Sequence, residues 1–440
     1  MDSMLIDSPD RSRRFSARCL ALLIALSMSA AALQFLPAPM AGAEKDKGQA
    51  RTVKPSRLPI MTWPGPEAAF LTPESFRLVA EAGFSINMSF FGSRDLNLKA
   101  LDLARAAGLR LMVHDDRVSK ILEDTSLPLD VLAAVVKDFR KHPAFYGYFV
   151  TDEPNASKFE RLGAIVRRLR ELDPDHPAYI NLFPTYANEQ QLGTPTYEEH
   201  VARYLETVQP PFLSFDHYPV MRSGLRPDFF RNLEIVRRMA LEHGLDLWAF
   251  TLATPHAVYP PPTLGHIRLQ LWSDIAYGAK ALQYFTFGTP GGMDYDWGSG
   301  LMGKDGRPGP AYALARQANA EIRRVEGLIL RWTSVAVFHS EPVPEGARPP
   351  AAGEPVTGAS GAPLVIGIFS AGREHYAVLV NRDYANQRTA VVRFASDVRE
   401  VREIAKNDRP PARLAWPADG SERTAVLAFG PGDARIFLLK

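Results

Sequence analysis

The sequence is almost free of cysteine: its 440 residues include only Cys19. A disulfide or a cysteine-ligated zinc site within one chain is therefore excluded, because each needs at least two cysteines. Cys19 itself lies in an N-terminal segment that has three distinctive parts. These are four arginines at positions 11, 13, 14 and 18, an apolar run over residues 19–36, and a small-residue triplet at 41–43.

This N-terminal pattern is typical of a secretory signal peptide, here residues 1–43. A cleaved signal peptide implies export, so we expect a periplasmic or secreted protein. An uncleaved membrane anchor is the alternative, because an apolar run of this length just reaches across a bilayer. No later stretch is long and apolar enough to cross, so we expect no membrane span after signal cleavage.

The chain also lacks an excess of charge of either sign, with 51 Lys and Arg against 49 Asp and Glu. Nucleic-acid binders usually carry a basic excess or a basic stripe, so no nucleic-acid partner is expected. Hydrophobic residues make up 46% of the chain and charged residues 23%, which excludes wholesale disorder and predicts a large core.

Between residues 58 and 335 a short apolar run followed by a segment of 3.6-residue periodicity recurs eight times. This alternation predicts parallel strands joined by helices, and eight units match a (β/α)8 TIM barrel. An open doubly wound sheet is the alternative, but it needs a glycine-rich phosphate loop after its first strand, and residues 63–66 are not one. The expected strands are 58–62, 85–90, 110–114, 145–150, 178–182, 212–215, 246–250 and 281–286.

Composition divides the remainder of the chain. Residues 44–57 are polar and lysine-rich and are expected to form a flexible lead-in, and residues 336–362 are rich in Pro, Gly and Ala and are expected to form a linker. Residues 363–440 hold short strand-like runs separated by turn residues, without a helical pattern. The sequence therefore predicts an α/β fold, a (β/α)8 barrel followed by a small C-terminal β-sandwich.

Barrel active sites form at the carboxyl ends of the strands, so the residues there are the candidates for chemistry. Carboxylates, imidazoles, amides and aromatic rings converge at this rim. Such a mixture suits a sugar, because rings pack on C–H faces while acids and amides bind hydroxyls. The candidates are Trp63, His114, Asp115, Asp152, Glu153, Asn181, Asp216, His217, Tyr218, Trp248 and Tyr284.

A metal-dependent hydrolase is the rival interpretation of this rim. The first strand has no His-x-His pair, which excludes one group of barrel metallohydrolases, but His114, Asp115 and Asp216 could hold an ion. We expect no catalytic metal and no cofactor.

The stretch Tyr-Gly-Tyr-Phe-Val-Thr-Asp-Glu-Pro at 146–154 is the most informative. A glutamate beside a proline at the end of the fourth strand resembles the acid/base of the large retaining clan of barrel glycoside hydrolases, the β-galactosidase and cellulase superfamily. The resemblance extends to residues 181–184 and 214–219 and, in architecture, to the C-terminal domain. It implies glycoside hydrolysis, with Glu153 as the general acid. The alternative is that Glu153 is a surface glutamate that only caps the start of the next helix.

Two departures from that clan leave the second catalytic group open. Asp152 stands where the clan has asparagine, and the seventh strand ends without the clan's nucleophilic carboxylate. Asp216 is one substitute, as nucleophile or base. The Asp152–Glu153 pair, which is similar to that of the substrate-assisted hexosaminidases, is another, and a loop acid (Glu189, Asp294 or Asp296) is a third.

The leading hypothesis is thus a secreted or periplasmic glycoside hydrolase that acts on an oligosaccharide, polysaccharide or glycoconjugate. The missing carboxylate on the seventh strand keeps a second hypothesis open: a carbohydrate-binding barrel without catalysis.

Overall fold

A computed structural model describes residues 55–440 except 292–295, 408–409, 411, 415 and 417–422. The predicted signal peptide, Cys19, most of the lead-in and the loop residue Asp294 lie outside the described residues. In the described part of the chain, no helix has the length and apolar character needed to span a membrane.

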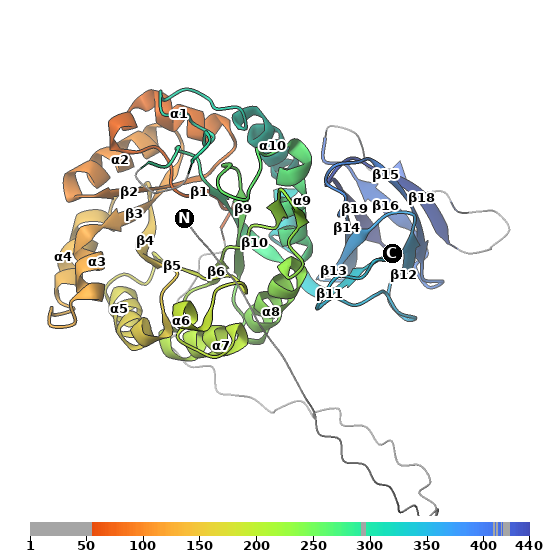
Figure 1. The fold of residues 1–440 in the computed structure, drawn as a ribbon, viewed down its shortest axis with the longest axis horizontal. Coiled ribbons are helices and arrows are strands. Elements are labelled where there is room, and N and C mark those ends of the chain that lie inside the picture. The colour runs from red at the N-terminus through yellow and green to blue at the C-terminus, as the bar shows by residue number, and fades with distance from the viewer. Residues whose placement is uncertain (1–54, 292–295, 408–409, 411, 415, 417–422) are drawn as a thin grey trace, which may run out of the picture. The chain divides into compact units, whose positions relative to one another are not determined.

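Eight parallel strands close into a barrel, in the order β1-β10-β9-β6-β5-β4-β3-β2, with the helices outside them (Figure 1). The prediction of a (β/α)8 barrel is confirmed, and every expected strand is present to within a few residues. The strands are β1 Ile60–Thr62, β2 Ile86–Gly92, β3 Arg110–Asp115, β4 Phe145–Asp152, β5 Ala178–Leu182, β6 Leu213–Phe215, β9 Leu247–Leu252 and β10 Ala279–Phe285.

The helices begin where short polar side chains can accept a hydrogen bond from the first turn. Thr72, Ser93 and Thr196 do so at the starts of α1, α2 and α7. The helices are α1 Pro73–Glu81, α2 Arg94–Ala106, α3 Asp116–Glu123, α4 Val131–Phe139, α5 Phe159–Leu172, α6 Glu189–Leu192, α7 Tyr197–Val208, α8 Phe229–Glu242, α9 Leu264–Ala276 and α10 Tyr312–Ile329, with short 3-10 turns at Ala68–Phe70 and Ala156–Lys158.

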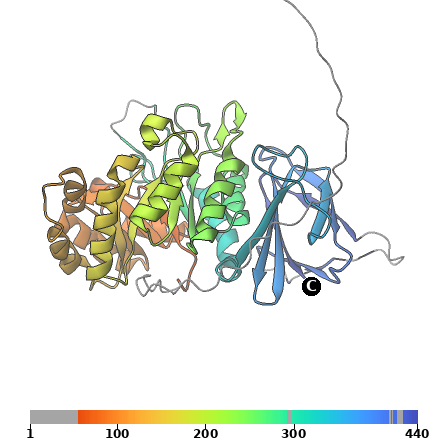
Figure 2. The ribbon, with the colours of Figure 1, turned by 90° about the horizontal axis from the view of Figure 1, so that it is seen from below.

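The segments after β5 and β6 carry additional structure that the periodicity did not predict. Helix α6 follows β5, and a hairpin of β7 Val220–Met221 and β8 Gly224–Leu225 follows β6. Figure 2 shows these yellow-green and green segments projecting at one end of the barrel. Because they follow strand carboxyl ends, they belong to the edge where barrel active sites form.

The C-terminal domain consists of two antiparallel sheets, with orders β11-β13-β14-β19-β16-β17 and β12-β15-β18. One apolar core fills the space between them, which confirms the predicted β-sandwich. Its strands are β11 Thr333–His339, β12 Val356–Ser360, β13 Leu364–Ala371, β14 Glu374–Asn381, β15 Arg388–Phe394, β16 Val401–Ile404, β17 Ala412–Arg413, β18 Thr424–Phe429 and β19 Ala434–Leu439.

Residues 336–362, expected to be a linker, instead supply most of β11 and all of β12. Phe338 and Val356 from this stretch are fully buried in the sandwich core. The Pro, Gly and Ala content that suggested a linker belongs to the turn between these two strands.

The larger sheet is apolar on both faces, which explains its nearly continuous hydrophobic strands. On β14, Ala377 and Leu379 face the sandwich core, whereas Tyr376 and Val378 join the core shared with the barrel helices. A Cβ at Gly367 of β13 would collide with the carbonyl oxygen of Ala276 at the end of α9, so glycine permits this close approach.

Candidate functional site

Three carboxyl groups meet at the carboxyl ends of β4 and β6. Asp152 is the last residue of β4, Glu153 follows it, and Asp216 follows β6. Between these strands lies β5, where the Nδ2 of Asn181 donates to Oδ1 of Asp152 (3.2 Å) and to Oδ1 of Asp216 (2.9 Å). Glu153 is also within hydrogen-bonding reach of Asp216. The structure therefore brings together all three predicted catalytic residues and the predicted Asn181.

A buried chain of hydrogen bonds fixes the orientation of the Asn181 amide. Ser214 donates to Oδ1 of Asn181 (2.9 Å), Gln283 donates to Ser214 (2.9 Å), and Tyr179 donates to Gln283 (2.6 Å). These side chains come from β5, β6 and β10 and are fully or almost fully buried in the barrel. Because Oδ1 of Asn181 is occupied by a donor, its Nδ2 must face the two carboxylates.

The backbone at Glu153 is unusual, with φ at +44°, in the left-handed region that residues other than glycine rarely adopt. Its N–H donates to the carbonyl oxygen of Asn181 at 2.9 Å, which continues the β4–β5 pairing past the end of the strand. Strained residues of this kind concentrate at functional sites, and here the strained residue is the predicted proton donor.

Burial raises the pKa of each of the three carboxyl groups, because desolvation penalises the charged form. The pKa of Asp152 is raised to about 7, by burial and then by the charge of Asp216. Glu153 has its pKa raised the furthest, by burial, by the charges of Asp216 and Asp152, and by its hydrogen bond to Asp216. Burial also raises the pKa of Asp216, but the hydrogen bonds from Asn181, Tyr218 and Glu153 oppose that rise. Glu153 therefore keeps a proton while Asp216 carries a charge.

The predicted residue Asp115, at the end of β3, lies in a different environment. Its carboxylate accepts from the backbone N–H of Arg117 at the start of α3 and from that residue's guanidinium at 2.9 and 2.8 Å. Arg117 also pairs with Asp138 at 2.9 Å. Asp115 thus stabilises the start of α3, and its suggested role in substrate binding remains a prediction.

Aromatic side chains form the opposite side of the barrel mouth, at the ends of β1, β2 and β10. Trp63 is the centre of this group, with ring centroids 5.3 Å from Phe90 and 5.7 Å from Phe285. Phe90 is 47% exposed and Phe285 partly exposed, so both present ring surface at the rim. Trp297 lies 5.9 Å from Phe285 and extends the group.

His114, His217 and Tyr218 occupy the rim between these two sides. His114 has its ring 5.2 Å from Phe90, and burial lowers its pKa. Tyr218 lies near Asp216, and its hydroxyl helps to hold down the pKa of that carboxyl group. His217 lies 3.4 Å from Asp228, and this interaction, with a hydrogen bond from Thr185, holds the pKa of Asp228 at about 2 despite its burial.

Two of the predicted substrate-binding residues lie elsewhere. Trp248, near the start of β9, stacks on Phe212 at 4.1 Å in the end of the barrel interior opposite the active-site rim. Tyr284 faces outward from β10, is fully buried, and donates to Asn319 of α10. The prediction that these two residues bind substrate is therefore wrong: each is part of the packing of the barrel.

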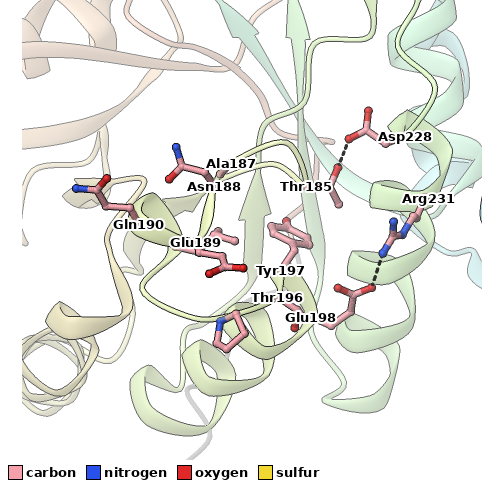
Figure 3. A pocket seen from close by; sticks show the side chains of 12 residues that line it. Thr185, Ala187, Asn188, Glu189, Gln190, Thr196, Tyr197, Glu198, Asp228 and Arg231 are labelled. Atoms are coloured by element: carbon pink, nitrogen blue, oxygen red, sulfur yellow. Dashed lines mark hydrogen bonds and ion pairs between the residues drawn. The ribbon is translucent and has the colours of Figure 1, made fainter. Parts of the chain in front are cut away.

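Of the three predicted loop acids, Glu189 and Asp296 are among the described residues, and neither belongs to the carboxyl cluster. Glu189 lies on α6, where it lines a pocket of about 660 Å³ between the loop after β5 and the starts of α7 and α8 (Figure 3). Asp296 is exposed, and Asp294 is not among the described residues. Tyr197 connects this pocket to the site, since the charges of Asp216 and Glu153 contribute to the rise in its pKa that burial causes.

Sequence reasoning missed several residues of the rim, namely Phe90, Phe149, Phe285, Tyr259 and Arg226. Phe90 ends an expected strand, but no residue at the end of that strand was among the candidates. Arg226 and Tyr259 lie in long loops, which give no periodic signal. Within the described ranges, no three His, Cys, Asp or Glu side chains are arranged to hold a metal ion.

No protein-family model matches the sequence, and no curated protein does. Similar solved structures are a β-galactosidase from Bacillus circulans sp. alkalophilus (TM-score 0.57, 9% identity, 87% of this chain and 99% of that chain) and a catalytic mutant of a GH42 β-galactosidase from G. stearothermophilus (0.56, 8%, 87% and 98%). A glycoside hydrolase family 5 structure from Bacteroides vulgatus follows (0.54, 10%, 87% and 88%).

The chain spans only 60% of the length of another β-galactosidase that it matches, from the psychrophilic Marinomonas ef1 (TM-score 0.45, 13% identity, 62% of this chain). The three structures above each align with 87% of this chain, which is more than the barrel alone makes up. At identities this low the likeness establishes the fold: this protein has the (β/α)8 barrel and C-terminal β-domain found in glycoside hydrolases.

Proposed function

We propose that the protein is a glycoside hydrolase in which Glu153 donates a proton to the oxygen of the leaving group. The position of Glu153 carries the proposal: it is a partly buried carboxyl group at the barrel mouth, with its pKa raised by burial and by the charges of Asp216 and Asp152. Glycoside hydrolysis needs such an acid, one that is still protonated at the working pH.

The main role of Asp216 is to keep the proton on Glu153. Retaining enzymes place their two carboxyl groups about 5–5.5 Å apart, and inverting enzymes place them farther apart still. Asp216 is near enough to Glu153 for its charge to raise the pKa of that carboxyl group, so we assign Asp216 to holding the proton and not to attack on the sugar or on water. Asp216 therefore keeps Glu153 protonated, as one member of a carboxyl dyad does for the other.

The group that stabilises the positive sugar centre is Asp152 together with the substrate's own acetamido group. Support comes from β9, the strand next to β6, where the inward-facing residues near the carboxyl end are Phe250 and Leu252, both apolar. Asp152 lies beside Glu153 and shares Asn181 with Asp216, so it is positioned to orient a substrate amide.

The test is hydrolysis of a panel of aryl glycosides, with and without N-acetyl groups, by the wild type and by Glu153→Gln. We expect the variant to lose about 10²–10⁴-fold in rate on any substrate that the wild type cleaves, which is the usual contribution of a general acid. Glu189→Gln is the control, because it removes a rim glutamate outside the carboxyl cluster. Unchanged turnover by Glu153→Gln would exclude Glu153 as the acid.

A carbohydrate-binding barrel without catalysis is the second candidate. The apolar end of β9, where a nucleophile is expected by resemblance, favours it. It predicts calorimetric binding of sugars together with no product release from any aryl glycoside over long incubation.

Export belongs to the proposal as well. Its support is the arginine-rich, then apolar, then small-residue pattern of residues 1–43. Mass spectrometry of the protein from a secreting host tests it: we expect a chain that begins at residue 44, and an intact N-terminus would contradict cleavage.

A further inference from the structure

Arg226, which follows the hairpin β7–β8, is an arginine without an acidic partner in the described part of the chain. Its Nη2 donates to the hydroxyl of Tyr259 at 3.2 Å, and its guanidinium carbon lies 4.1 Å from the ring centroid of Tyr186. Its Nε is buried and has no hydrogen-bond partner. The side chain is thus held between two phenols with part of its donor capacity unused.

Several other partly buried arginines have carboxylate or carbonyl acceptors within the fold. Arg117, Arg237 and Arg268 each pair with a carboxylate. Arg161 and Arg382 donate to backbone carbonyl oxygens instead. The Nε of Arg382 also lacks a partner, but that guanidinium bonds two backbone carbonyl oxygens, whereas the guanidinium of Arg226 bonds only the hydroxyl of Tyr259. A desolvated guanidinium is costly unless acceptors compensate it, so the buried Nε of Arg226 points to an acceptor that is not part of the fold.

The location of Arg226 connects it to the proposed site. Tyr186 lies in the loop after β5 and Tyr259 in the loop after β9, so the guanidinium sits over the barrel mouth. The ring of Tyr259 lies 5.9 Å from that of Tyr218, which is close enough to Asp216 to affect the pKa of that carboxyl group. Arg226 is therefore beside the carboxyl cluster, separated from it by two aromatic side chains.

We propose that the substrate carries an anionic group, a carboxylate or a sulfate ester, that Arg226 binds on a sugar unit next to the bond that is cleaved. This inference rests on the proposed function, because it assumes that the mouth binds sugar. Guanidinium groups bind planar anions through two parallel hydrogen bonds, and the flanking rings exclude water and strengthen that interaction.

The nearby carboxyl groups do not cancel this attraction. Burial raises the pKa of all three, and the neighbouring charges raise those of Asp152 and Glu153 further, so the three groups carry fewer than three negative charges around neutral pH. The proton that Glu153 keeps for catalysis thus also reduces the repulsion between the site and an anionic substrate.

The experiment is calorimetric titration with glucuronic acid, galacturonic acid, glucose 6-sulfate, glucose and galactose. We expect the wild type to bind at least one acidic sugar about ten-fold more tightly than its neutral counterpart, a difference of about 1.4 kcal/mol. A preference for the uronates identifies a carboxylate, and a preference for the 6-sulfate identifies a sulfate ester. Equal affinities, or no binding of any of these sugars, overturn the inference.

Arg226→Met is expected to reduce the preference to within about two-fold while neutral-sugar binding is kept, since only the charged contact is removed. Arg222→Met is the matched control, an exposed arginine on the same hairpin, and should keep the preference. If Arg226→Met fails to fold, Arg226→Lys replaces it, because the charge stays but the paired donors are lost and the preference should fall about three-fold or more. An unchanged preference in the folded variant contradicts the inference.

Two further measurements separate this inference from the proposed function. Glu153→Gln should retain the preference for the acidic sugar, because its change lies in the proton donor and not in the anion site. Binding preference without hydrolysis would refute the enzyme but keep the anion site, whereas hydrolysis of neutral glycosides without any acidic preference would refute the anion site alone.

Discussion

Neighbouring strand ends at the barrel mouth carry carboxylates in opposite environments. At the end of β3, Asp115 is almost completely buried against Arg117, so its negative charge is compensated. At the ends of β4 and β6, Asp152, Glu153 and Asp216 lie together, and the amide of Asn181 donates to two of them. The same position relative to a strand thus produces a structural ion pair in one place and a proton-holding cluster in another. The presence or absence of a cation decides which.

Asp115→Asn should give the largest effect, on stability. It leaves the guanidinium of Arg117 without its best partner, and breaking a buried pair costs about 3–5 kcal/mol in the free energy of unfolding. Urea denaturation measures it. Asp116→Asn, at the neighbouring exposed residue, should change stability by less than about 1 kcal/mol. Similar losses in the two variants would remove the contrast between the strand ends.

Asp216→Asn tests the other side of the comparison through the pH dependence of kcat/KM. Asp216 contributes negative charge that raises the pKa of Glu153, so its removal should lower that pKa. The alkaline limb, where Glu153 loses its proton, should then move to lower pH by about one unit or more. An alkaline limb that stays in place would show that Asp216 does not hold the proton of Glu153.

Ser214→Ala tests whether the buried hydrogen-bond chain positions Asn181. Loss of its hydroxyl leaves Oδ1 of Asn181 without its donor, so the amide is free to flip and the rate should fall about ten-fold. The alkaline limb should shift too, which a general loss of packing would not cause. Ser273→Ala is the control, since Ser273 of α9 is a buried serine whose hydroxyl has no partner.

Glu153→Gln should have the smallest effect, a small gain in stability at alkaline pH. A folded-state pKa above the unfolded value means that the native protein binds the extra proton, so stability falls as pH rises toward the folded pKa. Removing this titration should raise Tm at pH 8 by about 2 °C while leaving Tm at pH 5 nearly unchanged. An equal change at both pH values would argue against a raised pKa.

The barrel itself was largely predictable from the sequence. Each strand is a short apolar run followed by a helix-period segment, and helix ends coincide with glycines such as Gly83 and Gly108, which adopt positive φ. The β7–β8 hairpin and the short helix α6 could not be predicted in this way, because elements of two to four residues have no measurable periodicity.

The site was predictable in part, because the end of a strand can be located from the sequence but the direction of a side chain cannot. Position after a strand located Asp152, Glu153 and Asp216 correctly. The failure at Tyr284 concerns direction: alternate residues of a strand face opposite sides, and Gln283 takes the inward place next to Tyr284. The failure at Trp248 concerns position along the strand, because this residue faces the barrel interior but lies near the start of β9. Arg117, two residues after Asp115, was visible in the sequence as a possible partner, but only the structure shows the pairing.

The most direct test of the central claim is the titration of the Glu153 carboxyl, followed by infrared difference spectroscopy of the wild type minus Glu153→Gln across pH. The account predicts that the protonated-carboxyl band persists at neutral pH and that Asp216→Asn moves its disappearance to lower pH. A band that is already lost near the ordinary pKa of glutamate, about 4.3, would contradict it.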